Sequence, residues 1–595
     1  MSYENFKDVR FEDFSGGLNT KYEDNKIGDN QSPDLSNIDF DGRNSFTPRK
    51  GIELFGSSST STGSIRSAHV YTRYDGVEVP MRSQTTFMQY YNTETADWET
   101  LDSGFTSGQI FGYADYYDQV YYCNVSESMY RWNGLFGRVS GIVSATDTVV
   151  RVSTSNSLSA LGWLSAGSAV VDGYELYYTA LSSNALSTVT WGATFVSAAS
   201  QRAIAQLPLS SGFTSAPKGN IMLVNAARLF VAGASAVSSD IVYYSKVDDP
   251  TDFTISAAAA FGGTVRYPEG KGPITSLVTI PNNDDTIGVI KKGTQRGLQI
   301  RLNEDGTEGV IRPHILTSPD IGAVNHLGTA LAGNDVLFVS PKGRVRKLGS
   351  IENFEGRRDE NLAVAIEPTL SNFGVLSAAS MYNDGKYYLG VADDGSTFND
   401  VTFVYDTRYQ GWTRYAGINA GCWFIYGNDL YVNASNEIAT YKINTGYDDN
   451  DIAYQAYWSS KKIDYGIPNE MKRCRFIYVE GYIHQLCQVS ASVFYDDNSN
   501  AFLTKVIEGN ASYVDTQDTI TIGDSTWGST AFGNGEVTSY TLNKFRVRLS
   551  MAGGNFFNMQ IKFDSYINGT PFKITHIAPY VERATGEVFP ISSII

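Results

Sequence analysis

The chain has 595 residues, too many for one ordinary hydrophobic core, so we expect two to four domains. Aromatic residues make up 13% of the sequence and long windows with helical periodicity are missing, which favours an all-β protein over a helical one. The net charge of -17 argues against a protein that holds nucleic acid stably by neutralising phosphates.

The cysteines and the apolar segments restrict the chain further. Cys123, Cys422, Cys474 and Cys487 are too few and too scattered for a disulfide scaffold or a metal site, so we expect free thiols. A pairing of Cys474 with Cys487 across a hairpin stays open as an alternative. No apolar segment follows residues 1–10 and no run of 18 apolar residues occurs, so we expect synthesis in a cytoplasm, without a signal peptide or membrane span.

Residues 1–63 predict an extended N-terminal strap, because they are polar and show no sustained periodicity. Two glycines, Gly16 and Gly17, allow a sharp bend or a close approach to another chain. A turn at Pro33 would direct the apolar side chains after it into a neighbouring surface. We therefore predict a clip onto another subunit, although an arm packed on its own domain is the alternative. The candidate interface residues are Phe14, Gly16, Gly17, Leu18, Pro33, Leu35, Phe40 and Arg49.

The strap also carries three motifs in a fixed order. They are FSGGLNT at 14–20, NQSPDLSNIDF at 30–40 and TPRKG at 47–51. This combination resembles the N-terminal segment of the nozzle, or tail tubular B-type, proteins of short-tailed bacteriophages.

Residues 64–140 predict the first part of a β-propeller. Two units of β-like runs separated by tight polar turns cover this stretch, and each ends in an aromatic residue near a turn, Trp98 and Trp132. We expect these two indoles to pack one blade against the next.

Residues 141–212 predict an inserted small β-barrel, because Ser, Thr, Ala, Gly and Val dominate and charge nearly vanishes. The pattern VDGYELYYT at 171–179, followed by SSNAL, resembles the small barrel inserted in many phage structural proteins. Contact with another subunit and a plain solvated insert are both compatible with this composition.

Residues 213–446 predict the second part of the propeller. Three hairpins with Asn-Asp or Asp-Gly turns recur between 321 and 444, at the spacing expected of blades, and the total is roughly seven blades. The run YYSKVDDPTDF at 243–253 again resembles the phage group. One short connecting helix is expected within 357–370, closed by Pro368. Residues 447–595 change to longer alternating strands and predict a separate C-terminal β-sandwich.

No catalytic or metal-binding motif stands out in the sequence. Nucleophile-elbow, zincin and phosphate-loop patterns are absent, and the five histidines are far apart, so we expect no enzyme and no cofactor. The acidic loops at 283–285, 448–451 and 496–498 are expected to be solvated turns, with calcium binding as an alternative. Short basic patches at Arg344, Arg346 and Lys347 and at 461–475 favour subunit contacts over DNA contacts.

The resemblance implies a structural protein of a virion tail. Such a protein would form a ring, expected to be a hexamer, below the head-to-tail adaptor, and it would also meet tail fibre or tip proteins. DNA would pass transiently through the ring, and an acidic wall would let it slide. Two alternatives remain: a propeller that binds or cleaves glycans in the manner of sialidases, and a host-recognition tail component without a channel.

Overall fold

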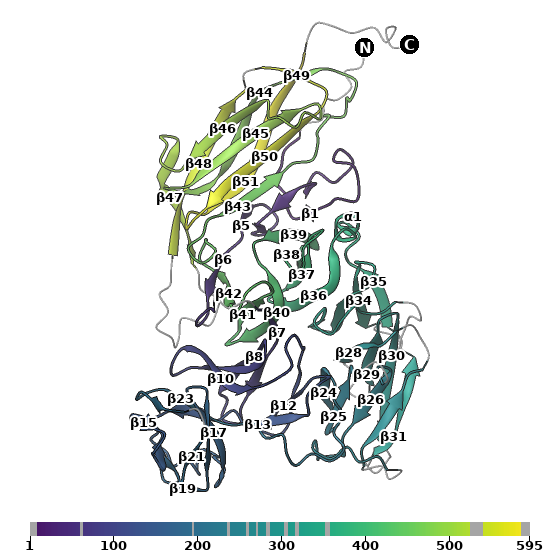
Figure 1. Cartoon of the computed structure of the whole chain (residues 1–595). Helices are drawn as coiled ribbons and strands as arrows, with labels where there is room; N and C mark the ends of the chain where they lie inside the picture. Colours follow the sequence, from purple (N-terminus) through teal and green to yellow (C-terminus); the bar gives the residue numbers. More distant parts are fainter. Residues whose placement is uncertain are drawn as a thin grey trace.

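A computed structural model describes residues 9–584 except 60–62, 193–194, 235–237, 257–260, 269–271, 281–285, 303–307, 316–320, 351–356, 524–538 and 552. Figure 1 shows three parts: a propeller in the middle, a small β domain beside it and an elongated sandwich at the other end. Almost every regular element is a strand. The described residues contain one short helix, α1 (Glu367–Leu370).

Seven antiparallel sheets in the described residues form the blades of the propeller. Blade 1 contains β7 (Ile65–Thr72), β8 (Glu78–Gln84), β9 (Phe87–Asn92) and β10 (Asp97–Ser103). Blade 2 contains β11 (Gly112–Asp115), β12 (Val120–Cys123) and β13 (Tyr130–Trp132). Blade 3 contains β24 (Ile221–Asn225), β25 (Arg228–Ala232), β26 (Ile241–Tyr244) and β27 (Gly263–Arg266). Blade 4 contains β28 (Ile274–Thr279), β29 (Thr286–Lys291), β30 (Thr294–Leu302) and β31 (Glu308–Ile315). Blade 5 contains β32 (Thr329–Ala332), β33 (Asp335–Val339), β34 (Val345–Ser350) and β35 (Arg357–Asn361). Blade 6 contains β36 (Gly374–Asn383), β37 (Lys386–Ala392), β38 (Val401–Asp406) and β39 (Gly411–Ala416). Blade 7 contains β40 (Ala420–Tyr426), β41 (Asp429–Ala434) and β42 (Thr440–Thr445), together with β6 (Gly51–Leu54).

The ring of blades closes through β6, which comes from the N-terminal strap. This strand pairs antiparallel with β42 and completes blade 7, while the chain enters blade 1 directly after it. The inner strand β40 of blade 7 lies beside β7 of blade 1. Closure therefore joins the two ends of the propeller by main-chain hydrogen bonds, and no blade of the ring is left without a neighbour.

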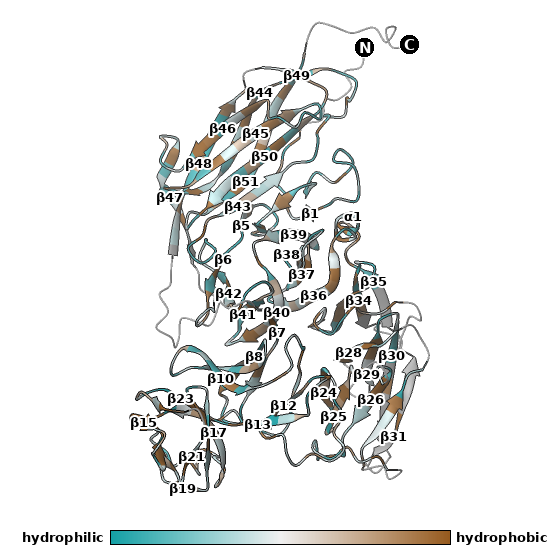
Figure 2. Cartoon of the chain, viewed as in Figure 1, coloured by the Kyte–Doolittle hydropathy of each residue, from teal (hydrophilic) through white to brown (hydrophobic). Residues whose placement is uncertain are grey.

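A hydrophobic cluster fills each junction between neighbouring blades. Trp98 packs with Phe424 and Tyr431 between blades 1 and 7, and Trp132 lies in the cluster between blades 1 and 2. Figure 2 shows hydrophobic residues gathered along the strands. The predicted packing role of both indoles is confirmed, because a blade can bury its two faces only against its neighbours.

The insert lies between blades 2 and 3, where blade 2 lacks a full fourth strand. Three small sheets surround one apolar core that includes Leu176 and Leu186. Its strands are β14 (Phe136–Arg138), β15 (Val143–Ser144), β16 (Val149–Arg151), β17 (Gly167–Val171), β18 (Tyr174–Tyr178), β19 (Ala180–Ser182), β20 (Ala185–Ser187), β21 (Thr190–Trp191), β22 (Ser197–Ala198) and β23 (Ala203–Gln206). The chain then returns to blade 2 through an isolated bridge from Leu209 to Arg131.

Two sheets form the C-terminal sandwich, and the strap contributes strands to both. The first sheet contains β3 (Leu35–Ser36), β43 (Tyr454–Ser459), β50 (Met559–Ile567), β45 (Gln488–Tyr495) and β46 (Leu503–Glu508). The second contains β4 (Ile38–Phe40), β5 (Phe46–Pro48), β51 (Phe572–Arg583), β44 (Lys472–His484), β48 (Ser539–Ser550), β47 (Val514–Gly523) and β49 (Asn555–Phe556). The remaining strap strands, β1 (Gly17–Leu18) and β2 (Gln31–Ser32), pair with each other.

The predicted fold class is confirmed: an all-β propeller with an inserted small β domain, a C-terminal sandwich and an extended strap. Two details differ from the predictions. Residues 357–361 form strand β35, and the helix covers only Glu367–Leu370, with Pro368 in its first turn. A proline fits there because the first helical turn needs no N–H donor. The four cysteines are buried and free, as predicted.

Candidate functional site: the joint between propeller and sandwich

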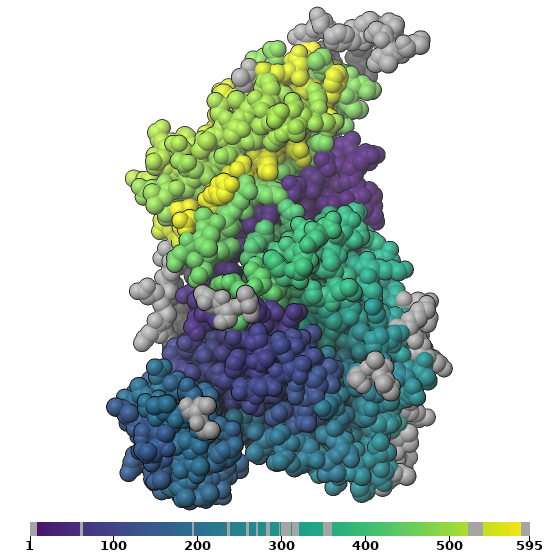
Figure 3. Space-filling view, in the orientation of Figure 1, coloured from purple at the N-terminus to yellow at the C-terminus, as the bar shows by residue number. Residues whose placement is uncertain are grey.

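The N-terminal strap lies between blade 6 and the sandwich. Figure 3 shows the purple N-terminal segment exposed between the green and yellow sandwich and the teal blades. Segments β1, β3 and β4 all lie against β39, the outer strand of blade 6, while β3 pairs with β43 and β5 pairs with β51. The strap is therefore shared by two domains, and we call this region the joint.

Gly17 brings the strap into direct contact with blade 6. Its φ angle is +66°, and a Cβ atom placed there would lie 2.5 Å from the carbonyl oxygen of Trp412. Both features demand glycine, because other residues seldom adopt positive φ and no side chain fits the gap. The second glycine of the FSGGLNT motif is thus required by this contact, whereas a Cβ at Gly16 would lie 2.6 Å from Cγ of Gln31 within the strap.

Arg49 is the central charged group of the joint. Its side chain is fully buried and donates through Nη2 to Oδ2 of Asp449 at 2.6 Å and through Nη1 to Oδ1 at 2.8 Å. Nε donates to Oδ1 of Asn37 at 2.9 Å, and Nη2 also donates to the carbonyl oxygen of Ala416 at 3.2 Å. The bidentate geometry matches a planar guanidinium to a carboxylate, so one arginine connects the strap, blade 6 and the linker at 449.

Aromatic rings complete the surroundings of Arg49. The guanidinium carbon lies 4.2 Å from the ring centroid of Tyr454, whose hydroxyl donates to the carbonyl oxygen of Arg49. Burial by itself would lower the pKa of Arg49, but the Asp449 carboxylate outweighs it and holds the pKa above its ordinary value. The charge is thus compensated inside the protein.

Asn37 fixes the backbone of the strap next to Arg49. It adopts φ +55°, and its Nδ2 donates to the carbonyl oxygen of Gln455 at 2.8 Å. Its Oδ1 accepts the backbone N–H of Ala416 at 2.9 Å in addition to Arg49 Nε. Asparagine tolerates this conformation, and its amide here bridges blade 6 and the sandwich.

A second, half-buried ion pair reinforces the joint. Nζ of Lys386, at the start of β37, lies 2.9 Å from Oδ1 of Asp39, and both side chains are 16% exposed. The hydroxyl of Tyr415 donates to the same carboxylate. Two ion pairs thus fix the strap to blade 6 and the linker, each supported by a tyrosine.

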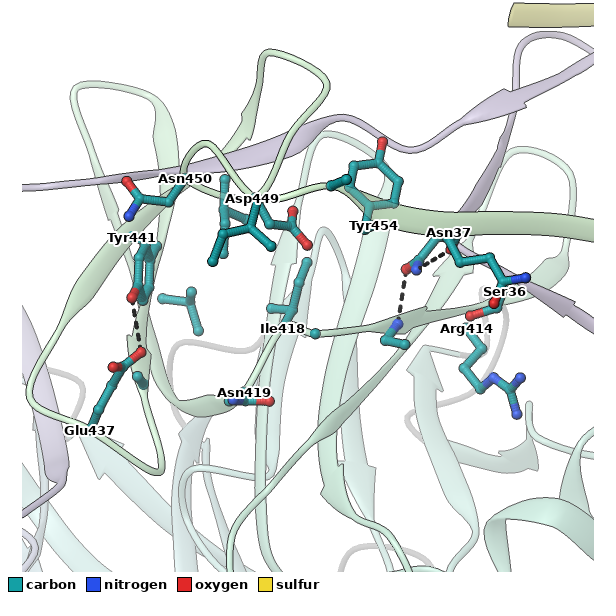
Figure 4. A pocket seen from close by; sticks show the side chains of 18 of the residues that line it. Ser36, Asn37, Arg414, Ile418, Asn419, Glu437, Tyr441, Asp449, Asn450 and Tyr454 are labelled. Carbon is teal, nitrogen blue, oxygen red and sulfur yellow. Dashed lines mark hydrogen bonds between the residues drawn. The ribbon is translucent and has the colours of Figure 1, made fainter. Parts of the chain in front are cut away.

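A cleft of about 570 Å³ opens beside Arg49 and Asp449. Figure 4 shows side chains from the strap, blades 6 and 7 and the linker around it, among them Asn37, Asn419 and Glu437. Glu437 accepts a hydrogen bond from the hydroxyl of Tyr441 at 2.8 Å, and Asp449 is engaged by Arg49. The acidic groups of the cleft are thus already bonded to neighbouring side chains.

Other candidate sites can be placed within the described residues. No group of three His, Cys, Asp or Glu side chains that could hold a metal ion occurs in that part of the chain. In the loop at 448–451, Asp449 binds Arg49, and in the loop at 496–498, Asp496 accepts backbone N–H groups of Phe557 and Asn558. The acidic loop at 283–285 lies outside the described residues. None of the described helices is long and apolar enough to cross a membrane.

The strap residues predicted to contact another subunit are placed inside this chain instead. Phe14 packs against Phe46 and Trp458 in the sandwich core, with ring centroids 5.1 and 5.4 Å away. The strap thus packs on its own chain, as in the alternative stated above, and a role of these residues in a contact with another subunit stays a prediction. Phe14, Gly17, Leu18, Leu35, Phe40 and Arg49 are buried, and Gly16 and Pro33 are half-buried.

The sequence did not assign a role in the joint to Asn37, Asp39, Lys386 or Asp449, although the first two belong to the motif at 30–40 and Asp449 to the acidic loop at 448–451. Arg49 and Asp449, which form the ion pair, are 400 positions apart in the sequence, so no local pattern reveals the pair. The only available signal was the polar Asn37 and Asp39 alternating with apolar neighbours in a strand-like run.

Comparisons with known proteins give no family for this chain. No family model and no curated protein matches it. Among solved structures it is similar to the computationally designed Ika8 protein, with TM-score 0.31, 10% identity, and coverage of 66% of this chain and 99% of that chain. It is also similar to the WD40 β-propeller domain of Doa1 (TM-score 0.30, 7% identity, 66% and 97%) and to YCF48 bound to D1 peptide (0.35, 9%, 69% and 97%). The propeller assignment rests on the seven sheets and their closure.

Proposed function

We propose that the protein is a structural subunit of a bacteriophage tail, assembling into a ring below the head-to-tail adaptor through which DNA is retained and then ejected. It acts by assembly and without catalysis. Its partners are further copies of itself, expected to be six in the ring, the adaptor and fibre or tip proteins. Its location is the virion tail.

The observation that carries the proposal is the joint. The three strap motifs that resemble the phage nozzle proteins contain Gly17, Asn37 and Arg49, the residues that bind the propeller to the sandwich in this chain. A subunit that bears load between an adaptor and a tail tip needs its domains fixed to each other. The compensated buried charges of the joint supply this fixation, because separating the domains would expose unpaired partners.

The insert offers a surface for contacts between neighbouring copies. Ile142 and Val196, on or next to its smallest sheet, are each 77% exposed although both are large and apolar. Apolar groups exposed in this way are often covered in an assembly. We assign this edge to the contact that repeats around the ring, where one surface meets a different surface of the next copy.

The test is the assembly state of the purified full chain. Mass measurement in solution and negative-stain images, with and without the adaptor, should show closed rings. The double variant Ile142→Asp/Val196→Asp should yield folded subunits that do not close rings. The matched control Val506→Asp, at a 47% exposed position of the sandwich, should still assemble. A strict monomer that does not bind the adaptor would contradict the proposal.

A further inference from the structure

A recess of about 770 Å³ lies between blades 4 and 5. Two hairpin turns line it: Lys292 and Gly293 connect β29 to β30, and residues 340–344 connect β33 to β34. The strand-entry segments at Gly272 and Gly322 complete the wall. The recess thus brings together turns from two neighbouring blades that are separate in the sequence.

Four cationic side chains line this recess: Lys292, Lys342, Arg344 and Arg346. Lys292 and Lys342 are exposed, and within the described ranges neither forms an ion pair. Arg344 pairs through Nε with Glu367 at 2.7 Å, while Arg346 also has a partner. Such a concentration of positive charge opposes the net charge of -17 of the chain, so it creates a local field for an anion.

The walls of the recess are held by close backbone packing. A Cβ atom at Gly322 would lie 1.7 Å from the carbonyl oxygen of Lys291, and the N–H of Ala323 donates to that same carbonyl at 3.2 Å. At Gly343, φ is +69° and a Cβ would lie 3.0 Å from the carbonyl oxygen of Leu370. The backbone of the recess is thus closely packed at Gly322 and Gly343, and the exposed side chains of Lys292 and Lys342 extend from it.

We infer that this recess binds phosphate groups, with the phosphodiester backbone of double-stranded DNA as the source. Lysine and arginine are the side chains that contact DNA phosphates, and arginine binds their oxygens in a bidentate manner. Glu367 already compensates Arg344, and Arg346 also has a partner, so the exposed Lys292 and Lys342 are the cations that are left to meet an incoming anion. Successive phosphates of one strand can compensate both at once, which favours DNA.

This inference deepens the proposed function and rests on it for its biological use. A chain of overall negative charge repels DNA along most of its surface, and a few cations in one recess would hold it weakly and reversibly. Brief retention of a passing duplex requires contacts of this kind. It also revises the expectation that the patch at Arg344 and Arg346 favours subunit contacts over DNA contacts, because Lys342 of the same turn and Lys292 of the turn in blade 4 join it.

The experiment is fluorescence anisotropy of a labelled 30-base-pair duplex with the full chain at several salt concentrations. Neutralising about two phosphates predicts a slope near -1.8 in log affinity against log salt, or roughly 12-fold weaker binding at 200 mM than at 50 mM. Lys292→Glu/Lys342→Glu should weaken binding at least about 10-fold at 50 mM and bring the slope close to zero. The control Arg151→Glu/Lys505→Glu changes the net charge equally at two exposed positions elsewhere, and its affinity should stay within about 3-fold.

Competition separates the two sources of phosphate. If inorganic phosphate displaces the duplex no better than chloride of equal ionic strength, the result supports the DNA backbone as the ligand. Selective displacement at millimolar phosphate would identify the small ion as the ligand and overturn the assignment to DNA. Absence of duplex binding, an equal loss in the control variant, or loss of self-association in place of DNA binding would each overturn the proposal. Ring images of Lys292→Glu/Lys342→Glu decide the tail function separately, because rings should persist whether or not DNA binds.

Discussion

The joint and the insert are attached to the same propeller by different means. The joint uses buried ion pairs, an asparagine with positive φ and a glycine contact, and its partners come from opposite ends of the chain. The insert has its own apolar core, made from residues near one another in sequence. It also packs on blades 1 and 2: Val170 and Ala205 are buried in the cluster of Trp132, whose Nε1 donates to the carbonyl oxygen of Gln206 at 2.7 Å. The difference teaches that the sandwich and the propeller are joined by buried polar contacts, whereas the insert has a core of its own and is joined to the propeller by apolar packing.

The largest effect is expected at Arg49. Arg49→Met leaves Asp449 and Asn37 without their main donor, and the joint should lose about 3–5 kcal/mol. Hydrogen exchange should rise in peptides covering 31–49 and 454–459, and urea unfolding should begin at lower concentration. Arg43→Met, at an exposed position of the same strap, is the control and should change little. Equal effects of the two substitutions would refute the central role of Arg49.

A cavity in the core of the insert should destabilise the insert without affecting the joint. Leu176 is fully buried, and Leu176→Ala should destabilise the insert by about 2–5 kcal/mol through the lost contacts and the cavity. Proteolysis should then cleave within 141–200 while exchange in 31–49 stays unchanged. The neighbouring Tyr177 is 50% exposed, and Tyr177→Ala should leave the insert intact. Faster exchange at the joint in Leu176→Ala would contradict the separability of the two regions.

Substitutions at Gly17 and Gly42 distinguish the cost of backbone strain from the cost of lost close packing. Gly17 and Gly42 have similar positive φ angles of +66° and +72°, but a Cβ at Gly42 meets nothing within 4 Å. Gly42→Ala should therefore cost about 1–2 kcal/mol for the conformation alone, while Gly17→Ala should cost more because its methyl group would strike Trp412. Thermal unfolding of both variants measures the difference. A cost at Gly17 no larger than at Gly42 would mean that the strap does not press on blade 6.

The smallest effect is an alkaline weakening of the joint. Burial disfavours the charged form of Lys386, but the Asp39 carboxylate outweighs it and raises the pKa of Lys386 above its ordinary value. A lysine with a raised folded-state pKa contributes its full stability below the unfolded-state pKa of about 10.4 and loses it as the pH rises further. The loss should be on the order of 1 kcal/mol by pH 11.5. The variant Lys386→Met/Asp39→Asn should show a shallower decline in unfolding midpoint above pH 10.4; parallel curves would refute the coupling.

Most of the blades could be predicted from the sequence because their pairing is local. Turns such as 383–385 and 427–429 connect strands that pair with each other, and their aromatic runs bury on neighbouring blades. The sequence indicated which strap residues are unusual, but it did not indicate whether they pack within this chain or contact another subunit. A buried phenylalanine and a phenylalanine at a subunit contact leave the same pattern in a polar segment.

The sequence by itself determined the all-β class, the repeating hairpins, the low-charge insert and the unusual strap. Only the tertiary structure decided that β6 closes the ring of blades, that β3, β4 and β5 belong to the sandwich, and that Arg49 meets Asp449. The physical reason is the range of the interactions. Turn chemistry and alternation act between residues a few positions apart, whereas strand pairing and charge compensation across several hundred positions depend on which surfaces the folded domains bring together.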